Sequence, residues 1–250
     1  MTVNLLILGG TTEARRLASA VAEAGLRGTV SLAGRVERPA PQGLPLRSGG
    51  FGGIAGLAGY LRETAVTHVI DGTHPFAAQM SANAVAACAE TGVPLLALTR
   101  PAWEQGPEDH WIRVPDIAGA VAELDRPAAR VMLAVGRMHL AEFAPNPQHA
   151  YLLRLVDPPA EPLPFPEHHV VVDRGPFTRD ADLKLLTDHR IELVVSKNAG
   201  GSGARAKIDA ARALGLPVIM IDRPAIPPRA EAHSVEAALA WLHGATERGV

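Results

Sequence analysis

Short apolar runs alternate with stretches of helical spacing along most of the chain. Residues 3–8 form an apolar run, interrupted only by Asn4, that ends at two glycines, which is typical of a buried parallel strand. Residues 11–24 then repeat their apolar positions with the period of an amphipathic helix. The same signals predict further strands at 29–33, 46–48, 68–71, 94–98, 151–156, 170–173, 193–196 and 218–221, and helices at 56–63, 77–90, 117–124 and 236–243. This alternation predicts an α/β protein with mainly parallel sheets.

Two stretches, which begin at residues 67 and 192, follow the same plan. Each contains a β-branched run, a polar loop, an Ala-rich stretch of helical spacing, Gly-x-Pro, a second apolar run and Arg-Pro-Ala. This is a βαβ unit that occurs twice, because parallel strands need such a crossover helix. Residues 130–137 likewise parallel residues 4–10. We therefore predict two Rossmann-like domains, residues 1–115 and 116–250, with an active-site cleft between them at the carboxyl ends of the strands.

The composition supports an α/β core and a small-molecule ligand. Apolar residues make up 47% of the 250 residues and aromatic residues only 4%, so Ala, Val, Leu and Ile must supply the core. A formal net charge of −2 provides no general attraction for nucleic acid or an anionic membrane. We therefore expect a small-molecule substrate, no nucleic-acid or membrane partner, and a monomer or weak homo-oligomer.

Cysteine and histidine positions add two further expectations. The single cysteine, Cys88, lies in a predicted helix and is expected to be a small core hydrophobe. One cysteine forms no internal disulfide, and no apolar run has the length of a signal peptide or membrane span, so a cytoplasmic location is expected. His168 and His169 are adjacent but have no third ligand at a recognisable spacing, so no metal site is predicted.

The loop after the first strand has the character of a phosphate-binding turn. Gly9 and Gly10 let a ligand approach the backbone, and the amides at the start of the following helix favour an anion. Thr12 stands where the G-x-G-x-x-G fingerprint has a glycine, so the motif alone is weak. The alternative is a tight turn in which Thr11 or Thr12 caps the helix.

The end of the second predicted strand favours NADP over NAD. NAD-binding folds place an acid there for the ribose 2′-hydroxyl, whereas an arginine accommodates the 2′-phosphate of NADP. Here Ser31 and Arg35 are available as donors, and no acid occurs before Glu37. The alternative for Arg35 is an ordinary solvated surface charge.

Cations recur at or just beyond the predicted strand ends. In a protein of net negative charge this indicates an anionic ligand, and arginine binds carboxylates with two parallel hydrogen bonds. A dinucleotide would occupy only some of these cations, so the surplus points to a second ligand with several carboxylates. Any single member could instead cap or flank an element. The set is Arg35, Arg100, Arg137, Arg174, Lys197 and Arg223.

Two strand-end loops carry candidates for proton transfer and anion binding. His74 lies in Asp-Gly-Thr-His-Pro-Phe, where an imidazole could exchange a proton near neutral pH, although a structural loop histidine is equally possible. In the counterpart loop, Lys197, Asn198 and the glycine amides could cradle phosphate or carboxylate oxygens.

Several enzyme classes lack their motifs in this chain. A Walker A loop would need Gly-Lys-Ser/Thr after the glycines, and no G-x-S-x-G elbow occurs, so neither ATP chemistry nor an α/β serine hydrolase is supported. A short-chain dehydrogenase expects Tyr-x-x-x-Lys, but neither Tyr60 nor Tyr151 has a lysine four residues later.

Nine segments together resemble the precorrin-6A reductase family, which includes the cobalt-precorrin-6A reductases. In order they are LILGGTTEAR, SLAGR, SGGFGG, DGTHPFAAQMSANA, LTRPAW, LVDPP, RGPF, SKNAGG and IDRP, and they extend over essentially the whole chain. The resemblance implies two Rossmann-like domains and hydride transfer from NADPH to a carbon–carbon double bond of precorrin-6A, giving precorrin-6B in cobalamin biosynthesis. A non-catalytic tetrapyrrole- or nucleotide-binding protein on the same fold is the alternative.

On this basis we expect three groups of site residues. The proton would come from His74, Lys197 or water. The macrocycle carries acetate and propionate groups, so a poly-carboxylate corrinoid precursor would explain the surplus of cations. We expect NADPH to contact Gly9, Gly10, Thr11, Thr12, Ser31, Arg35, Gly50, Gly52, Asp71 and Thr73. We expect the substrate to contact Phe76, Arg100, Arg137, Arg174, Ser196, Asn198, Gly200 and Gly201.

Overall fold

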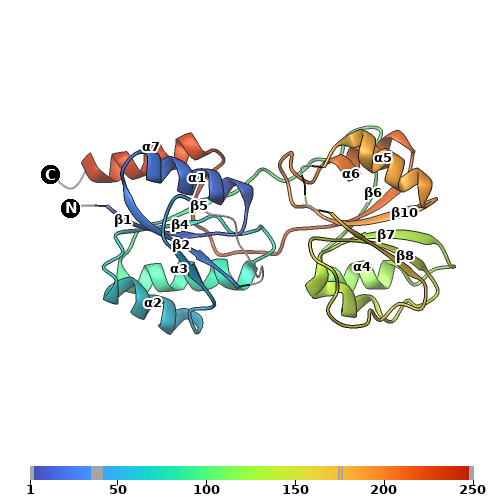
Figure 1. Ribbon diagram of the computed structural model, residues 1–250, viewed down its shortest axis with the longest axis horizontal. Coiled ribbons are helices and arrows are strands. Elements are labelled where there is room, and N and C mark those ends of the chain that lie inside the picture. Colours follow the sequence, from blue (N-terminus) through green and yellow to red (C-terminus); the bar gives the residue numbers. More distant parts are fainter. Residues whose placement is uncertain (1–2, 35–41, 174, 176, 248–250) are drawn as a thin grey trace. The chain divides into compact units, whose positions relative to one another are not determined.

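The computed structural model describes residues 3–34, 42–173, 175 and 177–247 (Figure 1). The chain forms two compact units: unit 1 is Met1–Arg100 together with Ala225–Val250, and unit 2 is Pro101–Pro224. This division differs from the expected domains 1–115 and 116–250. The chain enters unit 2 earlier than expected, and its last segment returns to unit 1, where it adds a strand to the first sheet. Two of the predicted ligand residues, Arg35 and Arg174, lie outside the described residues.

Unit 1 contains a six-stranded sheet in which every pair of neighbouring strands is parallel. The order is β12-β5-β4-β1-β2-β3, which is the 3-2-1-4-5-6 order of doubly wound nucleotide-binding folds if β12 is counted as the sixth strand. The strand order therefore reverses between β1 and β4. The strands are β1 (Asn4–Leu8), β2 (Arg27–Leu32), β3 (Leu46–Ser48), β4 (His68–Asp71), β5 (Leu95–Leu98) and β12 (Ala230–Ala232).

Helices cover both faces of this sheet. In Figure 1, α1 (Thr12–Glu23) and α7 (Val235–Glu247) lie on one face, and α2 (Gly53–Glu63) and α3 (Ala78–Thr91) lie on the other. The first face buries Leu17 and Val21 against the sheet, as the helical spacing of the sequence predicts. The second face buries Cys88 in a separate cluster, which confirms its expected role as a core hydrophobe. Burial, with a smaller effect of the Asp71 charge, raises the pKa of the Cys88 thiol to about 12.

Unit 2 repeats the same architecture with a second parallel six-stranded sheet, in the order β6-β11-β10-β7-β8-β9. Helices α5 and α6 lie on one face and α4 on the other (Figure 1). The strands are β6 (His110–Val114), β7 (Arg130–Ala134), β8 (Ala150–Leu155), β9 (His168–Val172), β10 (Leu193–Lys197) and β11 (Pro217–Ile221). The helices are α4 (Ile117–Glu123), the 3₁₀ helix η1 (Arg137–Phe143), α5 (Arg179–Asp188) and α6 (Ala206–Ala213).

The two βαβ units predicted from the sequence repeat are confirmed as β4-α3-β5 and β10-α6-β11. Two strands were not predicted, β6 and β12. Each lies at an edge of its sheet and is partly exposed, so it lacks the continuous apolar run that marks a buried strand. Within the part of the chain that the structure describes, no helix is long and apolar enough to cross a membrane.

Candidate functional site

The turn after β1 packs closely against the end of β2, and part of its backbone is not covered by side chains. The Gly9 amide donates a hydrogen bond to the Ser31 carbonyl at 2.9 Å, and a Cβ on Gly9 would lie 2.9 Å from Leu32 Cδ2. Gly10 has a φ of 126°, a backbone conformation that side chains other than glycine rarely adopt. A Cβ on Gly10 would meet no atom within 4 Å, so the backbone there borders open space.

Thr11 joins the two loops at the point where the strand order reverses. Its hydroxyl accepts a hydrogen bond from the Ala14 amide at 3.1 Å, which makes Thr11 the N-cap of α1, and it donates to the Gly72 carbonyl at 2.7 Å. The Gly72 amide in turn donates to the Leu8 carbonyl at 2.9 Å. Thr12 is exposed in the first turn of the helix. The structure thus fixes the loops after β1 and β4 against each other.

Asp71, the last residue of β4, is buried, and both of its carboxylate oxygens have partners within the protein. One carboxylate oxygen accepts hydrogen bonds from the Thr73 amide at 3.1 Å and the Thr73 hydroxyl at 2.7 Å. The other accepts from Ser81 Oγ at 2.6 Å and lies 3.4 Å from Arg229 Nη1. Asp71 and Thr73, both expected to bind the cofactor, are therefore used to shape the loop between β4 and α3. Ser81 and Arg229 were not predicted to take part.

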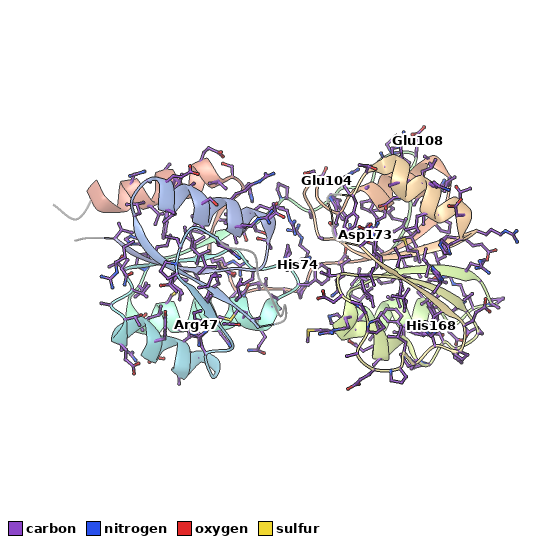
Figure 2. All side chains as sticks on the ribbon, viewed as in Figure 1. Arg47, His74, Glu104, Glu108, His168 and Asp173 are labelled. Atoms are coloured by element: carbon purple, nitrogen blue, oxygen red, sulfur yellow. The ribbon has the colours of Figure 1, made fainter. Side chains whose placement is uncertain are left out.

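His74 lies in the same loop and is partly exposed (Figure 2). Its Nδ1 accepts a hydrogen bond from the Phe76 amide at 3.2 Å, and the two rings lie 5.8 Å apart between centroids. Since Nδ1 is an acceptor, the neutral ring carries its proton on Nε2, as assigned from this hydrogen bond. In this tautomer Nε2 is a hydrogen-bond donor.

The remaining unit 1 residues lie along the same edge of the sheet. Arg100 follows β5, and its Nη1 lies 3.5 Å from a carboxylate oxygen of Glu13 in the first turn of α1. Ser31 is the penultimate residue of β2 and is buried. Its hydroxyl accepts a hydrogen bond from Arg47, a residue of β3 that was not predicted as part of the site. The only sequence signal for Arg47 was its position in a predicted short strand just before a glycine-rich run.

The counterpart loop in unit 2, between β10 and α6, is held by a neighbouring segment. Asn198 accepts from the Trp103 amide at 2.8 Å and donates to the Trp103 carbonyl at 2.9 Å. Trp103 Nε1 also donates to the Gly201 carbonyl at 2.6 Å. Gly200 has a φ of 69°, and a Cβ there would lie 2.2 Å from the Pro101 carbonyl oxygen. Asn198, Gly200 and Gly201, expected to contact substrate, thus fix the path of this loop.

The other predicted residues of unit 2 also lie at its carboxyl edge. Ser196 is fully buried and its hydroxyl donates to the Lys197 carbonyl at 3.2 Å, while Lys197 itself is partly exposed. Arg223 Nε donates to the Asn198 carbonyl at 3.0 Å. Arg137 is exposed at the start of η1. The structure therefore places the described members of each unit's predicted set at the carboxyl edge of that unit's own sheet.

A buried charged cluster near this loop was not predicted. Lys207 is 5% exposed, and its Nζ donates to the Ala204 carbonyl at 2.7 Å and lies 5.3 Å from the centre of the Trp103 ring. Burial, followed by the charge of Arg154, lowers the pKa of Lys207 to about 7. Arg154 forms a buried ion pair with Asp182. These charged residues lie far apart in the sequence, so the local sequence pattern does not show which of them lie close together.

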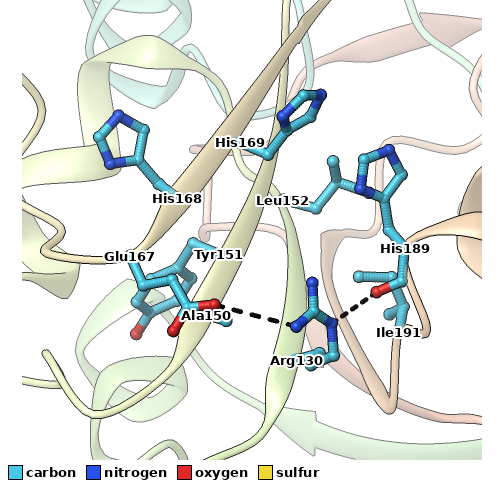
Figure 3. A pocket seen from close by; sticks show the side chains of 9 residues that line it. All are labelled: Arg130, Ala150, Tyr151, Leu152, Glu167, His168, His169, His189 and Ile191. Atoms are coloured by element: carbon cyan, nitrogen blue, oxygen red, sulfur yellow. Dashed lines mark hydrogen bonds and ion pairs between the residues drawn. The ribbon is translucent and has the colours of Figure 1, made fainter.

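A pocket at the opposite edge of the unit 2 sheet contains three histidines (Figure 3). The rings of His169 and His189 lie 4.7 Å apart, and Arg130 Nε donates to the His189 carbonyl at 2.7 Å. Burial and the neighbouring His169 lower the pKa of His189. The pocket lies at the amino ends of β7 and β8, away from the predicted loops. Among the described residues, no group of three or more His, Cys, Asp or Glu side chains is placed to hold a metal ion.

The fold and the unit 1 turn define a class of protein: a doubly wound α/β protein with a glycine turn at the switch point of a sheet that has the strand order of dinucleotide-binding folds. Residues 4–243 match the family model described as "Precorrin-6x reductase CbiJ/CobK". The chain is 58% identical over 248 residues to the precorrin-6A reductase of Rhodobacter capsulatus, covering 98% of this chain and 99% of that one.

Further comparisons agree. The precorrin-6A reductase of Mycobacterium tuberculosis is 42% identical over 245 residues, covering 98% of this chain and 99% of the relative. A solved structure described as "CobK precorrin-6A reductase" superimposes with a TM-score of 0.93 at 57% identity, covering 98% of this chain and 97% of that one. The chain belongs to the precorrin-6x reductase family, as the sequence resemblance indicated.

Proposed function

We propose that the protein reduces a carbon–carbon double bond of precorrin-6A with hydride from NADPH and forms precorrin-6B in cobalamin biosynthesis. The relatives named precorrin-6A reductase, which match this chain over nearly its whole length, support the substrate. The observation that carries the cofactor assignment is the glycine turn after β1, at the switch point of a sheet with dinucleotide-binding order.

The proposed cofactor site uses backbone that side chains do not cover. A Cβ at Gly10, Gly50 or Gly52 would meet no atom within 4 Å, so phosphate and sugar groups can approach these positions closely. Gly9 and the first turn of α1 would contact the pyrophosphate with Thr11 and Thr12, because helix-start amides favour an anion. Asp71 and Thr73 would act by holding the neighbouring loop in place.

The proposed substrate contacts divide into cations and loop-forming residues. Arg137, Arg174 and Arg100 would face the carboxylates of the macrocycle, with Arg100 positioned by Glu13. Phe76 would offer an apolar surface. Ser196, Asn198, Gly200 and Gly201 would contribute by shaping the loop that carries Lys197.

When bound, NADPH supplies a hydride to one carbon of the double bond, and a proton must reach the other carbon. The protein residues then have two tasks: to orient the ring against the nicotinamide and to deliver that proton. His74 is a candidate donor: with Nδ1 accepting from the Phe76 amide, the neutral ring would donate only a hydrogen bond through Nε2, and delivery of the proton would require the ring protonated on both nitrogens. Lys197 is the second candidate, at the end of β10.

The direct test mixes the purified protein with NADPH and precorrin-6A and follows the near-ultraviolet absorbance of NADPH. We expect NADPH to be oxidised only when precorrin-6A is present, with one equivalent of the reduced macrocycle formed for each NADPH consumed. Protein without precorrin-6A is the control. Binding of both ligands without oxidation would instead establish the non-catalytic binding protein, and the proposed reaction would be wrong.

A further inference from the structure

Arg47 lies at the centre of β3, directly beside Ser31 of β2 in the register of the parallel pair. Its Nη1 donates hydrogen bonds to Ser31 Oγ at 3.1 Å and to the Gly49 carbonyl at 2.7 Å, and its Nη2 donates to the Gly50 carbonyl at 2.7 Å. The guanidinium carbon lies 3.7 Å from the centre of the Phe51 ring. Stacking and three hydrogen bonds therefore hold the guanidinium in one orientation.

Among the described residues, no acidic side chain neutralises the charge of Arg47. All three hydrogen-bond acceptors are uncharged oxygens, and no carboxylate among the described residues forms an ion pair with Arg47. By contrast, Arg62 and Arg100 each lie against a glutamate. The described segments 27–34 and 42–53, which contain the ends of β2 and β3, include no Asp or Glu. A partly exposed, rigid cation therefore lies beside described segments that contain no acid.

Ser31 adds a second donor at the same place. Its hydroxyl oxygen accepts from Arg47, so the hydroxyl hydrogen can still be donated to another group. Arg47 itself has five N–H groups, of which three are used in these bonds, so two can still face an acceptor. Each of the two neighbouring side chains thus keeps donors that an anion could use. The glycines that follow leave room for it, because a Cβ at Gly49 or Gly50 would meet no atom within 4 Å.

The position of this pair identifies the anion. In dinucleotide-binding sheets, the adenosine ribose lies at the carboxyl end of the second strand, where an acid selects NAD and an arginine accommodates the 2′-phosphate of NADP. In unit 1, Ser31 lies at the carboxyl end of β2, and Arg47, labelled in Figure 2, lies beside it on β3. We infer that Arg47 is a specificity-determining residue that binds the 2′-phosphate of NADPH. This inference rests on the proposed function and adds to it the residue that reads the phosphate.

The test measures binding of two ligands that differ only in this phosphate: 2′-phospho-ADP-ribose and ADP-ribose, each titrated into the protein by calorimetry. Arg47→Gln keeps an amide that can bond the glycine carbonyls but removes the charge. We expect this variant to lose roughly 10- to 100-fold in affinity for the phosphorylated ligand, the usual loss for a charge-assisted bond. Its affinity for ADP-ribose should change less than about 3-fold.

Controls separate the charge of Arg47 from its structural role. Arg27→Gln changes an exposed arginine at the amino end of the same strand, β2, and should leave both affinities unchanged. Arg47→Lys keeps the positive charge but not the planar set of N–H donors of the guanidinium, and it should retain part of the preference for the phosphorylated ligand. Added salt should weaken that preference in the wild-type protein much more than in Arg47→Gln.

Three results would overturn the inference. An equal loss for both ligands would make Arg47 only a support of the glycine-rich loop. Unchanged affinities would place the 2′-phosphate elsewhere, for example at Arg35. If the wild-type protein bound neither ligand, both the cofactor site and this inference would be wrong. The binding test uses no precorrin-6A, so its result does not depend on the proposed reaction. If the protein preferred the phosphorylated ligand but did not oxidise NADPH in the presence of precorrin-6A, only the proposed reaction would be wrong.

Discussion

Units 1 and 2 are built on the same sheet but use it differently. Their strands correspond one to one when the two sheet orders are aligned, so β1 matches β7, β4 matches β10, and β12 matches β6. The connection between the first two strands of this alignment, β1 to β2 in unit 1 and β7 to β8 in unit 2, differs between the units. Unit 1 has a glycine turn followed by the 12-residue helix α1 with Thr11 as its N-cap, whereas unit 2 has only the 3₁₀ helix η1, and its N-cap residue, Gly136, has no capping side chain. A common sheet therefore does not imply a common ligand site.

The repeated crossovers, β4-α3-β5 and β10-α6-β11, also differ in how their loops are held. In unit 1, Asp71 is satisfied by Thr73 and Ser81 within its own βα segment. In unit 2, Asn198 binds the backbone of Trp103, in the segment by which the chain enters the unit. The unit 1 loop is thus held by its own residues together with Thr11 and Arg229, whereas the unit 2 loop is held by the segment through which the chain enters the unit, 95 residues away in the sequence.

The strongest test of this difference is Gly200→Ala in unit 2. The added Cβ would lie 2.2 Å from the Pro101 carbonyl oxygen at a φ of 69°, so loop and entering segment must separate. We expect the free energy of unfolding to fall by about 3 kcal/mol or more in denaturant titrations. Gly203→Ala is the matched control, because a Cβ there meets no atom within 4 Å. Similar stability of the two variants would show that the entering segment does not brace the loop.

A second test concerns the helices of the two repeats. Counted back from Gly92 and Gly215, Lys207 in unit 2 corresponds to Ala84 in unit 1, and both are buried. Burial lowers the pKa of Lys207 to about 7, below its ordinary value of 10.5. Between these pH values the unfolded chain holds a proton that the folded protein lacks, so the stability contributed at this position rises with pH.

Lys207→Met should remove this contribution. The free energy of unfolding is measured by denaturant titration between pH 7 and 10 and plotted against pH. We expect the upward slope of this plot to be smaller in the variant than in the wild-type protein by up to ~1.4 kcal/mol per pH unit. Lys184→Met is the control, because Lys184 is largely exposed and paired with Asp188 at the surface. An unchanged slope in Lys207→Met would mean that Lys207 remains charged in the folded protein.

The smallest expected change in stability comes from removing the threonine N-caps of α1 and α5, Thr11 and Thr178. Thr11 caps α1 and also donates to the Gly72 carbonyl, whereas Thr178 caps α5 with a single 3.3 Å bond from Ala181 and is exposed. We expect Thr11→Val to reduce the free energy of unfolding by about 1–2 kcal/mol and Thr178→Val by about 0.5–1 kcal/mol. Thr11→Ser, which keeps the hydroxyl, should stay close to wild type. Equal losses at both caps would show that the Gly72 bond adds nothing.

The local part of the fold was already determined by the sequence. Apolar runs that end at glycine, and Ala-rich stretches that end at Gly-x-Pro, predicted β1, α1 and both βαβ repeats, and they placed Gly9, His74 and Lys197 at strand ends. These features depend on residues close together in the chain, so periodicity and turn chemistry suffice to find them. The family resemblance rests on the same short segments.

Only the tertiary structure decided which distant segments meet. It assigned β12 to unit 1 and β6 to unit 2, because a short edge strand is defined by its partner rather than by its own pattern. It placed Arg47 beside Ser31, bound the Asn198 side chain to the backbone of Trp103, and buried Lys207. Charge, burial and hydrogen-bond partners of a side chain depend on packing between distant segments, which no local pattern records.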